Sequence, residues 1–203
     1  MGRDTGPRNK LSRREGVDLF GNGGESLQRR LDQPPGQHGR DTSRRRQRQS
    51  DYDRQLREKQ KVKRIYGLRE RQFRRFYQMA QQSSDLTGTA LLQLLERRLD
   101  NIVYRMGWAR TRPQARQMVT HGHILVDGRR VNIPSYLVDA EQRVALAQKT
   151  QRIPDVQDLI ETPVSVPEWL QRDEAQGTVL RLPQRGEIQE PVDEQLVIEF
   201  YSR

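Results

Sequence analysis

The segment LERRLDNIVYRMGWARTRPQARQMVTHGHILVDG, residues 95–128, contains two helical patterns followed by a hairpin signal. In the first pattern, apolar residues recur at steps of three and four, which predicts one helix with a single buried stripe. The stripe consists of Leu91, Leu95, Leu99, Ile102, Val103 and Met106. Arg98 and Arg105 are seven positions apart, so we expect both to project from one side of the helix, beside this stripe. Gly107 predicts the C-terminal end of the helix.

The second helical pattern begins at Thr111, whose side chain can cap the helix, and ends at Gly122. A proline follows in the first turn, where backbone donors lack partners within the helix. The apolar residues expected to be buried are Ala115, Met118 and Val119. Arg112 and Arg116 are four positions apart, so we expect them on one exposed face beside Arg110, where they would bind phosphate together.

A β-hairpin is predicted directly after the second helix. Residues 124–126 are apolar and are expected to form a strand, and Asp127-Gly128 is a pair that strongly favours a tight hairpin turn. The returning strand is expected to run through Val131 and Ile133. The two helices and the hairpin together predict a compact frame that holds several arginines for docking onto RNA.

The composition predicts a small hydrophobic core. Of 203 residues, 33% are hydrophobic, so part of the chain is expected to be stabilised by a partner. There is no cysteine, which excludes disulfides and thiolate metal sites. No apolar run is long enough to span a bilayer and no signal-peptide pattern is present, so we expect a cytoplasmic protein without membrane contact.

The charge is distributed unevenly along the chain. Residues 1–75 hold 22 Lys and Arg against 10 Asp and Glu, whereas residues 151–203 hold 5 against 11. Arginine dominates the basic third, and its planar side chain contacts phosphate oxygens in pairs, which favours nucleic acid as the partner. The acidic third is expected to face solvent or a basic protein, because like charges repel it from phosphate.

The remaining segments complete an α+β fold. We expect a helix from Ser50 to Gly67, with one arc that contains Tyr52, Leu56, Val62 and Tyr66. A second helix is expected at 69–82, with Phe73, Phe76, Tyr77 and Ala80 buried. Few acidic residues lie near the arginines of this second helix. Strands are expected at 136–138, 143–146 and 178–182, with Trp169 as an anchor and residues 196–201 packing as a closing segment.

The expected fold class is a helical N-terminal domain with an extended basic arm, plus an α/β RNA-binding module built of a two-helix corner, an antiparallel hairpin and a sheet. We expect residues 1–49 to form the arm, which orders on its target; a disordered solubilising tail is the alternative. Residues 50–94 would form the helical domain, 95–160 the RNA-binding module, and 161–189 the remainder of the second domain.

Short motifs along nearly the whole chain share their order and spacing with one known family. They are Gly6-Pro7-Arg8, Arg13-Arg14-Glu15-Gly16, Pro35-Gly36-Gln37-His38-Gly39, Ser50-Asp51-Tyr52, LREKQKVKRIYG at 56–67, Glu70-Arg71-Gln72-Phe73, RLDNIVYRMGW at 98–108, Thr111-Arg112, Ala115-Arg116-Gln117, Val131-Asn132-Ile133-Pro134-Ser135-Tyr136 and residues 196–202. In these motifs the chain resembles the family of bacterial-type small-subunit ribosomal protein four, a primary binder of small-subunit rRNA.

The resemblance implies a structural role in the small ribosomal subunit. It implies direct binding of rRNA, nucleation of the subunit body, and contact with small-subunit ribosomal protein five in an interface that affects translational accuracy. It also implies that residues 44–48 lie near the path by which mRNA enters, and that the C-terminal segment, about 190–203, returns to the helical domain. We expect no homo-oligomer.

The expected mechanism is recognition of folded RNA by shape and backbone, because the deep, narrow major groove of A-form RNA excludes side chains. The residues expected to bind rRNA are Arg8, Arg13, Arg14, Arg44, Arg45, Arg46, Arg48, Arg54, Arg57, Lys61, Lys63, Arg64, Arg71, Arg74, Arg110, Arg112 and Arg116.

Neither a metal site nor another cofactor is expected. Many members of the family that the chain resembles hold zinc through N-terminal cysteines, but Asn9 and Ser12 stand at two of those positions here. The three histidines, His38, His121 and His123, are too few for a predicted metal site without carboxylates.

Catalysis is not expected either, although Arg98-Leu99-Asp100 resembles a catalytic tripeptide of pseudouridine synthases. Asp100 falls within a predicted helix, where local ion pairs with Arg97 or contacts with Asn101 are the simpler interpretation. No nucleophile elbow, phosphate loop or dinucleotide fingerprint is present. An RNA-modifying enzyme is the second hypothesis and a free regulatory RNA binder the third.

Trp108 is predicted to pack in the core; base stacking is the alternative.

Overall fold

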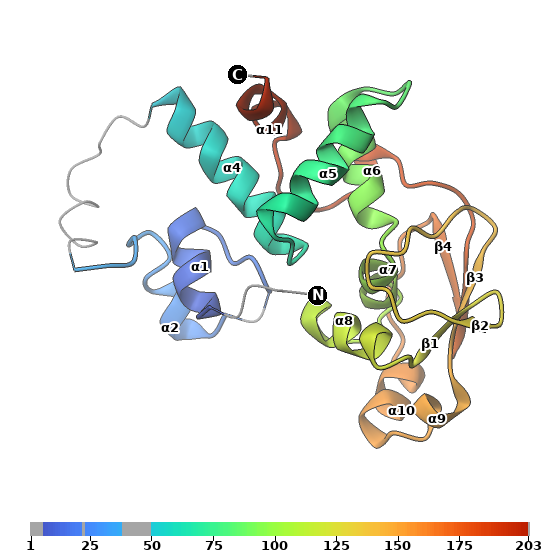
Figure 1. The fold of residues 1–203 in the computed structure, drawn as a ribbon. Coiled ribbons are helices and arrows are strands. Elements are labelled where there is room, and N and C mark those ends of the chain that lie inside the picture. The colour runs from blue at the N-terminus through green and yellow to red at the C-terminus, as the bar shows by residue number, and fades with distance from the viewer. Residues whose placement is uncertain (1–5, 22, 38–49, 203) are drawn as a thin grey trace. The chain divides into compact units, whose positions relative to one another are not determined.

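The structure is a computed structural model that describes residues 6–21, 23–37 and 50–202. Contacts divide the chain into two compact units (Figure 1). The first unit combines Met1–Gln78 with Pro191–Arg203, and the second unit is Met79–Glu190. The second unit is therefore inserted in the sequence of the first. No helix among the described residues is long and apolar enough to cross a membrane.

The described part of the first unit is helical. Its helices are α1 (Arg8–Glu15), α2 (Glu25–Gln28), α4 (Asp51–Ile65), α5 (Glu70–Gln81, whose last residues cross into the second unit) and α11 (Glu194–Tyr201). The hydroxyl of Ser50 caps α4 by accepting the backbone N–H of Asp53 at 3.2 Å, and Gly67 follows its end with φ of 63°. Both predicted ends of this helix are confirmed, as is the burial of Phe73, Phe76, Tyr77 and Ala80 in α5.

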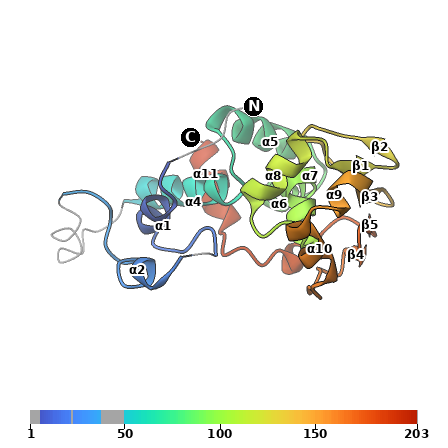
Figure 2. The ribbon, with the colours of Figure 1, turned by 90° about the horizontal axis from the view of Figure 1, so that it is seen from below.

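The closing segment is helix α11, which packs against α4 (Figures 1 and 2). Val197 is fully buried, and Tyr201 stacks on Tyr77 with ring centroids 4.5 Å apart. The phenol of Tyr201 donates a hydrogen bond of 2.7 Å to Glu70. The prediction that this segment packs as the end of the fold is confirmed. Tyr52, on the same arc of α4 as the buried Val62 and Tyr66, is 50% exposed, and its ring centroid lies 5.8 Å from that of Phe200.

The expectation of an extended arm is wrong for residues 8–15, which form helix α1. Ser12 in this helix is buried, and its hydroxyl accepts the backbone N–H of Leu19 at 3.3 Å. Leu19 and Leu27 are buried as well. Tertiary contacts therefore stabilise a segment whose sequence shows no apolar period. Residues 38–49 lie outside the described residues.

The second unit consists of helices and a five-stranded antiparallel sheet, so the predicted α+β class is confirmed. Its helices are α6 (Thr87–Glu96), α7 (Leu99–Arg105), α8 (Arg112–Thr120), α9 (Gln148–Gln151), α10 (Pro154–Glu161) and the 3-10 turn η1 (Arg185–Glu187). Its strands are β1 (Ile124–Val126), β2 (Arg129–Arg130), β3 (Arg143–Leu146), β4 (Leu170–Asp173) and β5 (Gln176–Val179). The order across the sheet is β2-β1-β3-β5-β4.

The hairpin forms as predicted, but its second strand is short. Asp127 and Gly128 have φ of 48° and 76°, as a tight hairpin turn requires, and Val126 pairs with Arg129. The returning strand ends at Arg130 instead of extending to 133. Residues 136–138 form no strand; Leu137 makes only an isolated bridge to Arg98.

The single helix predicted from 91 to 106 is wrong, because α6 ends at Glu96 and α7 begins at Leu99. Arg98, between them, is extended. The backbone N–H groups of Leu99 and Asp100 donate to the carbonyls of Tyr136 and Pro134, at 2.8 and 3.2 Å. A distant segment thus satisfies the first donors of α7, which allows the helix to restart.

The core of the second unit lies between the sheet and helices α7 and α8, which Figure 1 shows on one side of it. Trp169 is buried, which confirms its predicted role as an anchor. Trp108 is also buried, and its indole N–H donates to the carbonyl of Glu174 at 2.8 Å. Trp108 is therefore a packing residue, as predicted, and is not available for stacking on a base.

Candidate nucleic-acid interface

Helix caps and glycines with positive φ define the corner between α7 and α8, and both are local features of the sequence. Gly107 follows α7 with φ of 73°, and the hydroxyl of Thr111 caps α8 by accepting the backbone N–H of Gln114 at 3.3 Å. Gly122 follows α8 with φ of 70°. The predicted start and end of α8 are confirmed. Arg110, directly before the helix, is exposed, and its backbone N–H donates to the side chain of Gln114 at 2.8 Å.

Arg116 is buried, so its predicted place on an exposed face is wrong. Its guanidinium lies 3.4 Å from the carboxylate of Asp100, which Arg98 also contacts with two nitrogens. All three residues are less than 9% exposed. Arg98 was expected beside the apolar stripe, but the break between α6 and α7 turns it inward. Asp100 thus makes structural ion pairs, as predicted, although with Arg98 and Arg116 rather than with Arg97.

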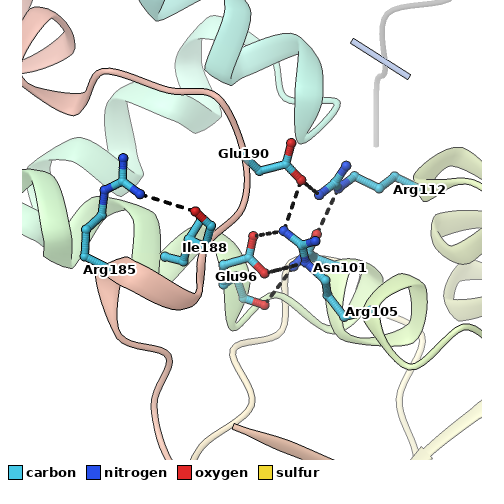
Figure 3. Close-up of polar contacts among 7 residues, drawn as sticks. All are labelled: Glu96, Asn101, Arg105, Arg112, Arg185, Ile188 and Glu190. Atoms are coloured by element: carbon cyan, nitrogen blue, oxygen red, sulfur yellow. Dashed lines mark hydrogen bonds and ion pairs between the residues drawn. The ribbon is translucent and has the colours of Figure 1, made fainter. Parts of the chain in front are cut away.

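Arg112 belongs to a second cluster at the same corner, which Figure 3 shows. Its Nε donates to Asn101 at 2.9 Å, one terminal nitrogen donates to Glu190, and its guanidinium lies 4.5 Å from the ring centroid of Tyr104. Only 14% of its side chain is exposed. The expectation that Arg112 lies on a freely exposed face is therefore wrong, because Asn101, Glu190 and Tyr104 contact it.

Arg105 completes this second cluster. Its Nε and one terminal nitrogen donate to the two carboxylate oxygens of Glu96 at 2.9 and 2.8 Å, and the same terminal nitrogen reaches Glu190 at 3.0 Å. Glu96 is 1% exposed and also accepts a hydrogen bond of 2.8 Å from Asn101. We call Glu96, Asn101, Arg105, Arg112 and Glu190 the corner cluster.

Exposed arginines that the sequence interpretation missed lie on the hairpin, at the C-terminal end of α8. Arg129 and Arg130 form the edge strand β2, and both are exposed. Arg130 donates to the carbonyl of His121 at 2.9 Å, and its guanidinium lies so close to Gly122 that an added Cβ would overlap it. The sequence signal that could have indicated them is their position directly after the hairpin turn Asp127-Gly128. Further exposed basic residues outside the predicted rRNA-binding set are Lys10, Arg29, Arg30, Arg69, Arg75, Arg143, Lys149 and Arg152.

His123 connects the end of α8 to α9. Its Nδ1 lies 2.8 Å from the hydroxyl of Thr150. Burial lowers the pKa of His123 below its ordinary value, and the neighbouring His121 and Arg130 lower it further. The imidazole is therefore neutral near neutral pH. Among the described residues, no three His, Cys, Asp or Glu side chains are grouped so that they could hold a metal ion.

In the first unit, Glu15 holds two of the predicted arginines. Its buried carboxylate, at the end of α1, pairs with Arg64 and lies 3.4 Å from Arg57, both on α4. Burial raises the pKa of Glu15, while Arg64 and Arg57 act against that rise. These two arginines are therefore partly neutralised and fixed in place, rather than forming a freely solvated face.

The predicted lysines of α4 are also paired. Lys61 lies 2.8 Å from Glu58, and Lys63 lies 3.1 Å from Glu70. Glu70 also accepts a hydrogen bond of 3.0 Å from Lys59. Glu58 lies on the same helix as these lysines, and Glu70 lies on α5, so the basic face of α4 is partly neutralised from within the helix and from the adjoining one.

The structure divides the predicted rRNA-binding residues by exposure. Those that are exposed are Arg8, Arg14, Arg54, Arg71, Arg74 and Arg110. Those that are partly buried are Arg13, Arg57, Lys61, Lys63, Arg64 and Arg112. Arg116 is buried. Arg44, Arg45, Arg46 and Arg48 lie outside the described residues.

Comparison with known proteins gives matches along the whole chain. Residues 3–96 match the family described as "Ribosomal protein S4/S9 N-terminal domain", and residues 97–144 match the family described as "S4 domain". The chain is 53% identical to small ribosomal subunit protein uS4 of Herpetosiphon aurantiacus over 213 residues, with 100% of both chains covered. The proteins of the same name from Chloroflexus aurantiacus and Persephonella marina are 49% and 50% identical, again with 100% of both chains covered.

Proposed function

This chain belongs to the uS4 family of small ribosomal subunit proteins, and from that membership we propose that it binds small-subunit rRNA directly as a structural constituent of the subunit body. The family is a structural one within the ribosome. We propose that the chain catalyses no reaction. The ion pairs that hold the buried Asp100 between Arg98 and Arg116 support this, since that carboxylate is not presented to a substrate.

The exposed arginines at both ends of α8 carry the proposal of direct rRNA binding. Arg110 precedes the helix, Arg130 donates to the carbonyl of His121 at its other end, and Arg129 is the neighbour of Arg130 in β2. Guanidinium groups contact phosphate oxygens in pairs. Because the deep, narrow major groove of A-form RNA excludes side chains, a rigid frame of such groups recognises the position of phosphates across a folded RNA.

Salt dependence tests this proposal. If the chain neutralises roughly six to ten phosphates, its affinity for a transcript of small-subunit rRNA should fall by about three to five orders of magnitude between about 50 and 200 mM salt, because bound counterions are released. Filter binding across this range gives the slope. A dissociation constant that barely changes with salt would contradict the proposal.

We further propose that the chain nucleates assembly of the subunit body. A protein that fixes the phosphates of several RNA helices orders the RNA in advance. Later binding steps then lose less conformational entropy. Reconstitution of small subunits from rRNA and individual proteins, with this chain withheld, should leave the body unassembled. Stable cosedimentation with small subunits separates this role from that of a free regulatory RNA binder.

Two finer proposals rest on the family alone. The chain would contact small-subunit ribosomal protein five at an interface that affects translational accuracy, and residues 44–48 would lie near the path of incoming mRNA. Crosslinkers placed singly at residues 44–48 of assembled subunits should capture mRNA. Crosslinking should also recover small-subunit ribosomal protein five, and its absence among the products would contradict the first of these proposals.

A further inference from the structure

The carboxylate of Glu190 lies between two arginines of the corner cluster (Figure 3). One of its oxygens accepts hydrogen bonds from Arg105, at 3.0 Å, and from Arg112. The three side chains are 14–15% exposed, so this contact is shielded but still reaches solvent. An anion from outside can therefore approach the two guanidinium groups once the carboxylate moves.

Both arginines are oriented by groups other than Glu190. Glu96 binds Arg105 through both of its carboxylate oxygens. Asn101 accepts from Arg112, and Tyr104 lies against its guanidinium. If Glu190 moved away, these contacts would keep both side chains in place. A pre-oriented pair of guanidinium groups binds an anion without a large loss of side-chain entropy.

The segment that carries Glu190 is anchored before that residue. Ile188 is buried, and Gln184 and Glu187 form a reciprocal capping box around η1. Gln93 of α6 donates to the carbonyl of Pro183 at 3.1 Å. Gln189, by contrast, is exposed. The side chain of Glu190 can therefore rotate away while the contacts that hold the segment remain.

The charges of the corner cluster cancel while Glu190 is in place. Arg105 and Arg112 supply two positive charges, and Glu96 and Glu190 supply two negative charges. Without the carboxylate of Glu190, the other three charged side chains of the corner cluster would sum to one positive charge. A carboxylate and a phosphodiester each offer a guanidinium two acceptor oxygens and one negative charge.

We propose that Arg105 and Arg112 form a binding site for a phosphodiester of the RNA backbone, and that the carboxylate of Glu190 occupies this site until RNA replaces it. The inference rests on the proposed function, which is rRNA binding, and adds Arg105 to the residues that contact RNA. Glu190 is a competitor within the chain, so it weakens rRNA binding.

Glu190→Gln tests the proposal because it removes the charge and keeps a hydrogen-bond acceptor. At low salt the variant should bind the rRNA transcript about three- to tenfold more tightly than the unchanged chain, on the scale of one partly exposed ion pair. Glu161→Gln on α10 is the matched control, since it removes one exposed charge from the same unit. Equal affinities of the two variants would overturn the proposal.

A double-mutant cycle separates direct competition from a general effect of charge. In a chain that carries Arg112→Gln, the tightening caused by Glu190→Gln should become smaller, because one of the two arginines that the carboxylate occupies is gone. An undiminished gain would overturn the proposal. Thermal melting of each variant ensures that folded proteins are compared.

The same measurements distinguish this inference from the proposed function. If the unchanged chain does not bind the transcript, both fail. If the unchanged chain binds with strong salt dependence but Glu190→Gln behaves like Glu161→Gln, only the competition by Glu190 is wrong.

Discussion

Two arginines that are six positions apart around α8 have opposite environments. Arg116 shares the buried carboxylate of Asp100 with Arg98, whereas Arg110 is exposed. Removing one partner of a buried ion pair leaves a charge without compensation, while an exposed charge interacts only weakly with the rest of the protein. Arg116 therefore stabilises the fold, and Arg110 is available to RNA.

Arg116→Gln should lower the free energy of unfolding by about 2–4 kcal/mol, because Asp100 keeps only one of its two cations. Its affinity for rRNA, measured where the variant is folded, should remain within about twofold. Arg110→Gln is the control and should weaken RNA binding without changing the urea midpoint. Weaker RNA binding by Arg116→Gln at unchanged stability would show that our assignment is wrong.

Gly122 is required for two reasons, its φ of 70° and its contact with Arg130. Gly122→Ala should destabilise the protein by about 1–3 kcal/mol and also weaken rRNA binding, because the new Cβ displaces the guanidinium of Arg130. Gly128→Ala is a matched control, since Gly128 has φ of 76° but no atom within 4 Å of an added Cβ. The control should lose stability through backbone strain and keep more of its RNA affinity; equal losses of affinity would contradict a role for Arg130.

At the scale of elements, Glu70 connects three helices of the first unit. It accepts hydrogen bonds from Lys59 and Lys63 of α4 and from Tyr201 of α11. Burial acts to raise the pKa of Glu70, but the hydrogen bonds from Tyr201, Lys59 and Lys63 outweigh burial and lower it below its ordinary value of 4.5. The ionised carboxylate therefore stabilises the packing of these helices.

The sign of the resulting pH dependence follows from this lowered pKa. The stability that Glu70 contributes is present above pH 4.5 and is lost as the pH falls through the lower pKa of the folded state. Tyr201→Phe should lower the free energy of unfolding near neutral pH by about 1 kcal/mol, a value reduced for the partial exposure of Glu70. It should also lose less stability on acidification, since its Glu70 pKa lies closer to the ordinary value.

Urea unfolding of both proteins at several pH values between neutrality and acid would measure this difference. In a chain that also carries Glu70→Gln, Tyr201→Phe should no longer change the acid dependence. Parallel stability curves for Tyr201→Phe and the unchanged chain would contradict the assignment to Glu70.

At the scale of the whole molecule, both units carry exposed arginines. Arg71 and Arg74 lie on α5 in the first unit, and Arg129 and Arg130 lie on the hairpin of the second. If both units bind one rRNA at the same time, each pair contributes separately to the number of neutralised phosphates. The contributions of well-separated groups to binding then add.

Replacing either pair by glutamine should reduce the slope of log affinity against log salt by about 1.5–2, and replacing both pairs should reduce it by about twice as much. Arg181→Gln with Arg185→Gln is the control, because it removes two charges from the acidic C-terminal third. If replacing both pairs reduced the slope no more than replacing one pair, only one unit would contact the RNA.

The sequence by itself determined the elements whose signals are local. Ser50 and Thr111 start α4 and α8, Asp127-Gly128 forms the hairpin turn, and glycines follow the ends of three helices. These predictions were correct because a cap or a positive φ depends on residues only a few positions away. The family was also evident, since motif order is a property of the sequence alone.

Only the tertiary structure decided which arginines remain available to a partner. The break at Arg98 arises because backbone carbonyls of Pro134 and Tyr136 bind the first turn of α7, more than thirty positions away along the chain. Glu190 reaches Arg112 across a still longer separation. Helical spacing places side chains on a face, but the charge and burial of that face depend on distant segments, so periodicity could not separate the buried Arg116 from the exposed Arg110.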